Sequence, residues 1–284
     1  MTPTSTLLPG AGRPTSRCMK RFIPFVKKPP LVAVVRLQGI IAAQGRGAAL
    51  NDAGLAGLLQ KAFSKGKPKA VALVVNSPGG SPSQSSLIAA RIRRLAEEKE
   101  TKVYAFVEDV AASGGYYIAS AADEIWVDHH SITGSIGVIS AGFGFDQFIE
   151  RYGVERRVYT AGKSKSMLDP FRPEKEEDLA RLKVIHEHIH GAFIDHVKSC
   201  RGDRLNTGME LFDGSVFVGA QAIETGLVDG VGHVVPKMKE LFGDDVTFRA
   251  YGQRRGLLTR LGAYVLSDAL SEVESRAAFA RFGV

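Results

Sequence analysis

The chain has 284 residues, of which 44% are hydrophobic and 24% are charged, and its formal net charge is +7. This length and composition allow a substantial core, which excludes a wholly disordered protein. No stretch reaches the ~18 apolar residues of a membrane span. The two cysteines, Cys18 and Cys200, are too few for a disulfide scaffold and favour a reducing compartment.

The positive charge is concentrated at the N-terminus. Residues 1–30 contain no acid and six basic residues, so the rest of the chain is near +1, and nucleic-acid binding is excluded as its main role. Residues 1–30 are also rich in proline and lack periodicity, which predicts a basic, disordered segment without signal peptide or membrane anchor. An organellar transit peptide is the alternative, and Met19 is an alternative start of translation.

Strands and helices alternate after residue 30, as judged from apolar runs and apolar periodicity. The predicted strands are Leu31–Leu37, Ala70–Val75, Val103–Val107 and Glu124–Val127, with a strand-like segment at Arg157–Thr160. The predicted helices are Leu50–Lys65, Ser85–Lys99, Gly115–Ala122 and Lys175–Lys198. This order predicts an α/β fold in which crossover helices connect mostly parallel strands.

A single domain over residues 31–250 is expected to contain these elements. Residues 251–284 form a predicted amphipathic helical extension, with apolar residues at broadly helical spacing and arginines at its start. That pattern leaves two alternatives open, a membrane-surface contact and packing on a neighbouring subunit.

Two glycine-rich turns follow two of the predicted strands. Asn76–Gly80 follows the first, and Ala111–Tyr117, which contains Ser113, follows the second. Parallel strands that end in such turns bring exposed backbone N–H groups together at one edge of a sheet, beside a hydroxyl nucleophile. The pattern indicates acyl transfer, although a serine between glycines is also common in ordinary tight turns.

A candidate base lies in the segment Ala161–Phe171. Lysines in loops are usually solvated surface charges, but this segment is bounded by glycine, serine and proline, which indicates a loop held in place. A lysine accepts a proton only when neutral, and burial in an apolar site favours that form. Lowering a lysine pKa by roughly 3 units costs about 4 kcal/mol.

Five strings occur in order along the chain: "NSPGG", "ASGGYYIASAADEIW", "TGSIGV", "KSKSMLDPF" and "GLVD". With them, the chain resembles the signal peptide peptidase A family of serine proteases over roughly residues 31–235. The resemblance implies a Clp-protease/crotonase-like fold and a Ser–Lys dyad, and neither a cofactor nor a metal.

The resemblance also implies a role for each matching residue. Ser113 corresponds to the nucleophile and Lys165 to the general base, with Lys163 as the second choice. Ser135 corresponds to the hydroxyl that orients the base. The oxyanion hole would be formed by the N–H of Gly114 and an N–H of Gly79 or Gly80.

Other readings of the sequence remain open. His186, Glu187 and His190 fit the H-E-x-x-H pattern of zinc proteases, with Glu210 as the nearby third ligand. A crotonase-type acyl-CoA enzyme would use the same oxyanion hole, with Glu108 and Asp109 as acid/base groups. An inactive scaffold with the same fold is a third alternative.

Peptide hydrolysis is the expected reaction, on signal-peptide remnants or unfolded segments with small or apolar side chains. The resemblance implies a homo-oligomeric ring in which adjacent subunits share the dyad. Three phenylalanines would line either a substrate groove or a contact between subunits: Phe143, Phe145 and Phe148. A cytoplasmic location is expected, with peripheral membrane contact left open.

Overall fold

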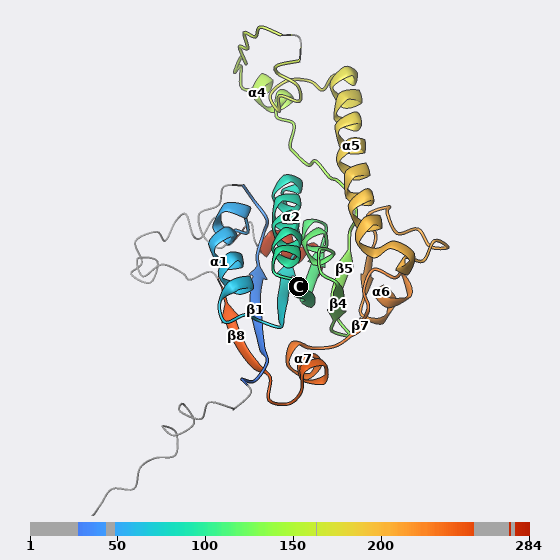
Figure 1. The fold of residues 1–284 in the computed structure, drawn as a ribbon. Coiled ribbons are helices and arrows are strands. Elements are labelled where there is room, and N and C mark those ends of the chain that lie inside the picture. The colour runs from blue at the N-terminus through green and yellow to red at the C-terminus, as the bar shows by residue number, and fades with distance from the viewer. Residues whose placement is uncertain (1–27, 44–48, 163, 253–272, 274–275) are drawn as a thin grey trace, which may run out of the picture.

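The computed structural model describes residues 28–43, 49–162, 164–252, 273 and 276–284. Most of the predicted N-terminal segment and most of the predicted C-terminal extension lie outside the described residues, as do Cys18 and Lys163. A central sheet with helices on both faces forms the body of the molecule (Figure 1).

The sheet has eight strands in the order β6-β5-β3-β2-β1-β8, and β4 and β7 extend it from β3. Among the described strands, every pairing is parallel except that of β5 with β6. The strands are β1 (Leu31–Gln38), β2 (Ala70–Ser77), β3 (Lys102–Ala112), β4 (Glu124–Val127), β5 (Ile132–Gly134), β6 (Val216–Val218), β7 (Gly230–Val231) and β8 (Thr247–Tyr251). All eight residues of β2 are buried, as expected for a central parallel strand covered on both faces.

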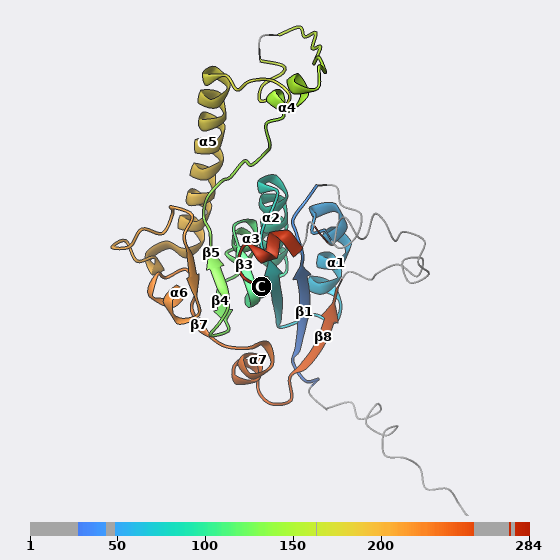
Figure 2. The same cartoon turned by 180° about the vertical axis from the view of Figure 1, so that it is seen from behind.

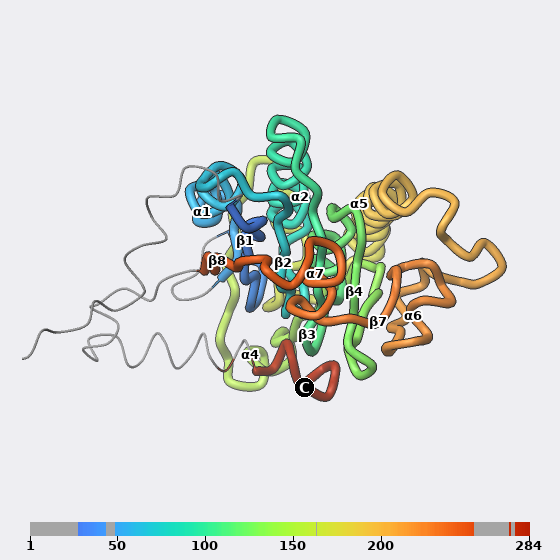
Figure 3. Tube along the Cα trace, turned by 60° about the horizontal axis from the view of Figure 1, so that its bottom comes forward, coloured from blue at the N-terminus to red at the C-terminus, as the bar shows by residue number. Residues whose placement is uncertain are grey.

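Three helices, α1 (Asp52–Ser64), α2 (Pro82–Glu98) and α3 (Gly114–Ala119), cover one face of the sheet and share the larger apolar cluster with it. Figure 3 shows α1 and α2 on one side of the strands. The opposite face, seen in Figure 2, packs a second cluster against α7 (Val234–Phe242). The other labelled helices are α4 (Asp146–Arg151), α5 (Glu176–Arg201) and α6 (Ala220–Glu224), with a 3₁₀ turn at Gly202–Arg204. Residues 276–280, near the end of the chain, are also helical.

The predicted α/β fold with a mostly parallel sheet is confirmed, with shifted boundaries. The helix predicted at Ser85–Lys99 begins at Pro82, because Ser81 caps its N-terminus and proline is favoured in the first turn. The strand predicted at Val103–Val107 continues to Ala112, directly before Ser113. The helix predicted at Gly115–Ala122 ends three residues early, at Ala119.

Residues 140–175 and the upper half of α5 form an arm that projects from the body (Figures 1 and 2). The prediction of a strand-like segment at Arg157–Thr160 is wrong, since residues 154–160 have no regular structure and are mostly exposed. A strand needs a neighbour for its backbone hydrogen bonds, and this segment pairs with none of the described strands. The arm was not predicted from the sequence.

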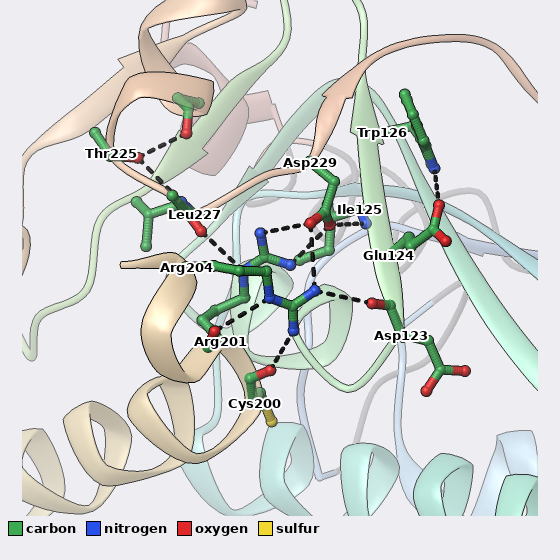
Figure 4. Close-up of polar contacts among 12 residues, drawn as sticks. Asp123, Glu124, Ile125, Trp126, Cys200, Arg201, Arg204, Thr225, Leu227 and Asp229 are labelled. Atoms are coloured by element: carbon green, nitrogen blue, oxygen red, sulfur yellow. Dashed lines mark hydrogen bonds and ion pairs between the residues drawn. The ribbon is translucent and has the colours of Figure 1, made fainter. Parts of the chain in front are cut away.

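A buried ion pair anchors the lower end of α5 to the sheet. Arg201 is 2% exposed, and its guanidinium donates to Asp229 over 2.8 and 3.0 Å and to the Gly226 carbonyl over 2.9 Å. Asp229 also accepts from the Ile125 N–H at 2.7 Å and from Arg204 at 3.3 Å (Figure 4). The network joins α5, β4 and the segment before β7, and so fixes the direction in which α5 leaves the body.

Candidate active site

Ser113 lies between the end of β3 and the start of α3. Its φ is +52°, a region that non-glycine residues seldom adopt, and such strain persists only where the surroundings hold it. Its N–H donates to the Gly134 carbonyl at 2.9 Å, and its carbonyl accepts from the Tyr117 N–H at 3.0 Å. The serine is therefore fixed on a sharp strand-to-helix turn at the carboxyl edge of the sheet.

The second glycine turn lies directly against this one. Strands β2 and β3 are parallel, with Ser77 opposite Ala111, so both turns leave the same edge. A Cβ atom added to Gly79 would lie 2.8 Å from both the Gly114 nitrogen and the Ser113 Cβ. Only glycine permits this approach, and the predicted juxtaposition of the two turns is confirmed.

The hydrogen bonds distinguish Gly79 from Gly80, the two alternatives for the second donor of the oxyanion hole. The Gly79 N–H donates to Ser77 Oγ at 3.2 Å and is therefore engaged. In the part of the chain that the structure describes, no acceptor is bonded to the N–H of Gly80 or of Gly114. The Gly80 nitrogen would lie 3.4 Å from a Cβ on Gly114, so these two free donors are neighbours. The role of Ser77 was not predicted from the sequence, although a serine hydroxyl can accept from the backbone N–H two residues further on.

Ser135 directly follows β5, and the last residue of that strand is hydrogen-bonded to Ser113. Gly134, the residue before it, accepts the Ser113 N–H, and Ser135 itself donates its N–H to the Ser215 carbonyl at 2.7 Å. Ser135 is half-buried and also has a positive φ, +51°. The structure thus brings three of the predicted elements together: Ser113, the Ser135 segment and the glycine turns.

Lys165 is not part of this group in the single chain. The segment between α4 and α5, which contains it, lies at the far end of the arm (Figure 1). Lys165 is exposed, so the apolar environment expected for a lysine base is not provided by the described part of this chain. Lys163 lies outside the described residues.

The loop that carries Lys165 is nevertheless held in place, as predicted. Ser164 bonds to Arg181 of α5, and the Phe145 N–H donates to the Pro170 carbonyl at 2.6 Å. Asp169 accepts from the Phe171 N–H at 3.1 Å and from Arg156 at 3.3 Å. The hydrogen bond from the Phe171 backbone has the largest effect, and with the one from Arg156 it holds the pKa of the Asp169 carboxyl below its usual range.

The two histidines of the H-E-x-x-H pattern, and His188 between them, lie on α5. The Nε2 atoms of His186 and His190 bond to Ser140 Oγ and to the Ile136 carbonyl oxygen, while His188 is exposed. Among the described residues, no group of three or more metal-ligating side chains is found, and Glu210 instead accepts from the Phe212 N–H. The described residues therefore do not supply the third protein ligand that a zinc site at this pattern would need.

Glu108 and Asp109, the candidate acid/base groups of the acyl-CoA alternative, each bind another side chain. Glu108 forms a bidentate ion pair with Arg36, with N–O distances of 2.7 and 2.8 Å. Asp109 accepts a hydrogen bond from the Asn76 side-chain amide at 2.5 Å. Glu108 lies on the same face of β3 as Phe106 and Tyr104, which belong to the cluster under α7. That face is opposite the one covered by α3.

The described residues form a Clp-protease/crotonase-like α/β fold, with a serine on the turn that follows a central parallel strand. Comparison with known proteins agrees with this class, because the profile of peptidase family S49 matches residues 95–242. The chain belongs to this family, the signal peptide peptidase A family.

Individual relatives match different fractions of the chain. It is 45% identical to a Na(+)/H(+) antiporter NhaA of Brucella melitensis over 94% of this chain, but spans only 39% of that protein. It is 38% identical to a putative signal peptide peptidase SppA of Enterococcus faecium, over 58% of this chain and 48% of that protein. The chain thus spans less than half the length of either relative.

A solved structure supports the fold alone. It is a lysine-to-alanine mutant of the 1510-N membrane-bound stomatin-specific protease in complex with a substrate peptide. The TM-score is 0.51 at 15% identity, over 84% of this chain and 99% of that one. Among the described residues of this chain, none of the helices has the length and apolar character needed to cross a bilayer.

Proposed function

We propose that this chain is a serine endopeptidase, with Ser113 as the nucleophile and Lys165 as the general base. The observation that carries the proposal is that Ser113 lies beside two backbone donors, the N–H groups of Gly80 and Gly114, for which the described residues supply no acceptor. Such donors stabilise the oxyanion of a tetrahedral intermediate. Membership in peptidase family S49 supports the same reaction class.

The reaction would proceed through an acyl-enzyme. The neutral amine of Lys165 takes the proton from Ser113 Oγ as this oxygen attacks the scissile carbonyl carbon. The resulting oxyanion is bound by Gly80 and Gly114, and the protonated amine then gives its proton to the leaving nitrogen. Water, activated by the same lysine, hydrolyses the ester. Ser135 aligns the amine by a hydrogen bond and adds no charge.

The substrates would be released signal peptides or unfolded segments with small or apolar side chains near the cut. The name of the Enterococcus faecium relative, putative signal peptide peptidase, supports this class. The crotonase-type alternative is less well supported, because Glu108 and Asp109 already have partners.

A serine-directed fluorophosphonate probe tests the nucleophile. We expect covalent labelling of the purified protein, with the added mass on the peptide that contains Ser113, and no effect of a zinc chelator on labelling or on hydrolysis of a fluorogenic apolar peptide. Hydrolysis that the chelator abolishes and that the probe leaves intact would instead support the zinc alternative based on His186 and His190.

We further propose that Lys165 completes the site of a neighbouring copy in a homo-oligomeric ring. Lys165 is exposed, and it lies on an arm that projects from the body that holds Ser113 (Figure 2). The arm also exposes large aromatic side chains, with Phe143 at 80%, Phe148 at 60% and Tyr159 at 91% of their surface. Exposed apolar surface of this kind is typical of protein contacts.

Mixing two inactive variants tests this arrangement. A Ser113→Ala variant keeps Lys165, and a Lys165→Ala variant keeps Ser113, so a mixed ring would contain complete shared sites. We expect the mixture to regain hydrolysis of the apolar peptide after dissociation and reassembly. The control mixture pairs Lys165→Ala with the double variant and should stay inactive. Absence of recovery in rings shown to be mixed would contradict a shared dyad.

A further inference from the structure

Two histidines of α5 contact the segment that leaves β5. His190 Nε2 lies 3.0 Å from the Ile136 carbonyl oxygen, and His186 Nε2 lies 2.7 Å from Ser140 Oγ. His188, on the same helix, is exposed. Because a carbonyl oxygen only accepts hydrogen bonds, the His190 ring carries a proton on Nε2 and donates it.

Hydrogen bonds hold the backbone on both sides of Ser135. The Gly134 carbonyl accepts from the Ser113 N–H at 2.9 Å, and the Ser135 N–H donates to the Ser215 carbonyl at 2.7 Å. The Ile136 carbonyl, one residue after Ser135, accepts from His190. Of these three bonds, the one from His190 is made by a side chain. Ser135 has φ +51°, a conformation that persists only where the surroundings hold it.

The side chain of Ile136 is buried in the larger apolar cluster, so packing holds the start of this segment. Farther along the segment, an open pocket of about 140 Å³ lies between it and α5, lined by Val138, Lys183, His186, Glu187 and His190. The hydrogen bonds of His186 and His190 are therefore polar contacts that tie the segment to α5 in addition to the packing of Ile136.

We propose that His190 is a positioning residue for the reaction, which fixes the backbone next to Ser135 and so sets the direction of the Ser135 hydroxyl. The inference rests on the proposed function, in which that hydroxyl aligns the lysine base. His190 does not touch the reacting atoms. The same helix also continues into the arm that carries Lys165, so one rigid element holds both the orienting serine and the arm.

Kinetics of three variants on the apolar peptide test the proposal. We expect His190→Leu to lower kcat about 10-fold or more, with KM little changed, since small misplacements of a reacting group are costly. His190→Gln keeps an N–H donor and should retain most of the activity. His188→Leu, on the same helix, is the matched control and should behave as wild type. If His190→Leu does not fold, His190→Asn, whose amide is too short to reach, replaces it.

Two further measurements decide how His190 acts. In a Ser135→Ala background, His190→Leu should cause no further loss of kcat, because both changes remove the same alignment. Amide exchange near Ile136 should become faster in His190→Leu and not in His188→Leu, whether or not the protein is a peptidase. An additive loss in the double variant, or unchanged exchange, would overturn the proposal. Failure of Ser113→Ala to reduce hydrolysis would refute the proposed function without affecting the exchange result.

Discussion

A Ser113→Ala variant is expected to lose about 10⁴–10⁶-fold in kcat on an apolar peptide, because the acyl-enzyme can no longer form. The methyl side chain fits the same strand-to-helix turn, so the fold should be unchanged. Any residual activity would come from direct attack by water, whose developing oxyanion the Gly80 and Gly114 N–H groups still bind. Stopped assays at high enzyme concentration, with thermal melting as the check on folding, measure the loss.

Lys165→Ala should cause a loss of similar size, and combining it with Ser113→Ala should add little. Residues that act as one unit give strongly non-additive losses, since removing either member removes the reaction. Lys163→Ala is the matched control, two residues away in the same loop, and should remain near wild type. The assignment of the base would be reversed if Lys163→Ala lost activity and Lys165→Ala kept it.

The sheet and its two glycine turns could be predicted from the sequence because their signals are local. The buried run Ala70–Val75 needs no distant partner to be recognised, and a turn that follows a parallel strand has a determined place at the sheet edge. For this reason the meeting of Gly79 with the Ser113 turn was predicted correctly. The engagement of the Gly79 N–H by Ser77 is a side-chain detail that the same pattern did not reveal.

The arm and the histidines could not be predicted because their contacts join distant parts of the chain. The H-E-x-x-H pattern is local, but His190 bonds to Ile136 and His186 to Ser140, both on another element. Arg157–Thr160 contains the β-branched and aromatic residues that favour a strand, yet none of the described strands pairs with it. Whether such a segment forms a strand depends on neighbours that its own residues do not specify.

Replacing Asp229 by asparagine is expected to lower the free energy of unfolding by about 3–5 kcal/mol, because the guanidinium of Arg201 would remain buried without its counter-charge. For a chain of this size, that corresponds to a fall in Tm of roughly 10 °C. Arg204→Met is the control: Arg204 is exposed, bonds the same carboxylate at 3.3 Å and donates to three backbone carbonyls. Because water can replace these exposed contacts, its loss should cost clearly less than that of Asp229, about 1 kcal/mol.

The same carboxylate should make stability depend on pH in a defined direction. Burial alone would raise the pKa of Asp229, but its hydrogen bonds with Arg201 and the Ile125 N–H outweigh burial and hold that pKa below the usual value. The unfolded chain binds this proton more readily, so the stabilisation is complete above about pH 4 and is lost as pH falls through the lowered pKa. The difference in Tm between wild type and Asp229→Asn should therefore shrink in acid. A difference that stays constant down to pH values well below the lowered pKa would show that Asp229 stabilises the fold by packing and not by its charge.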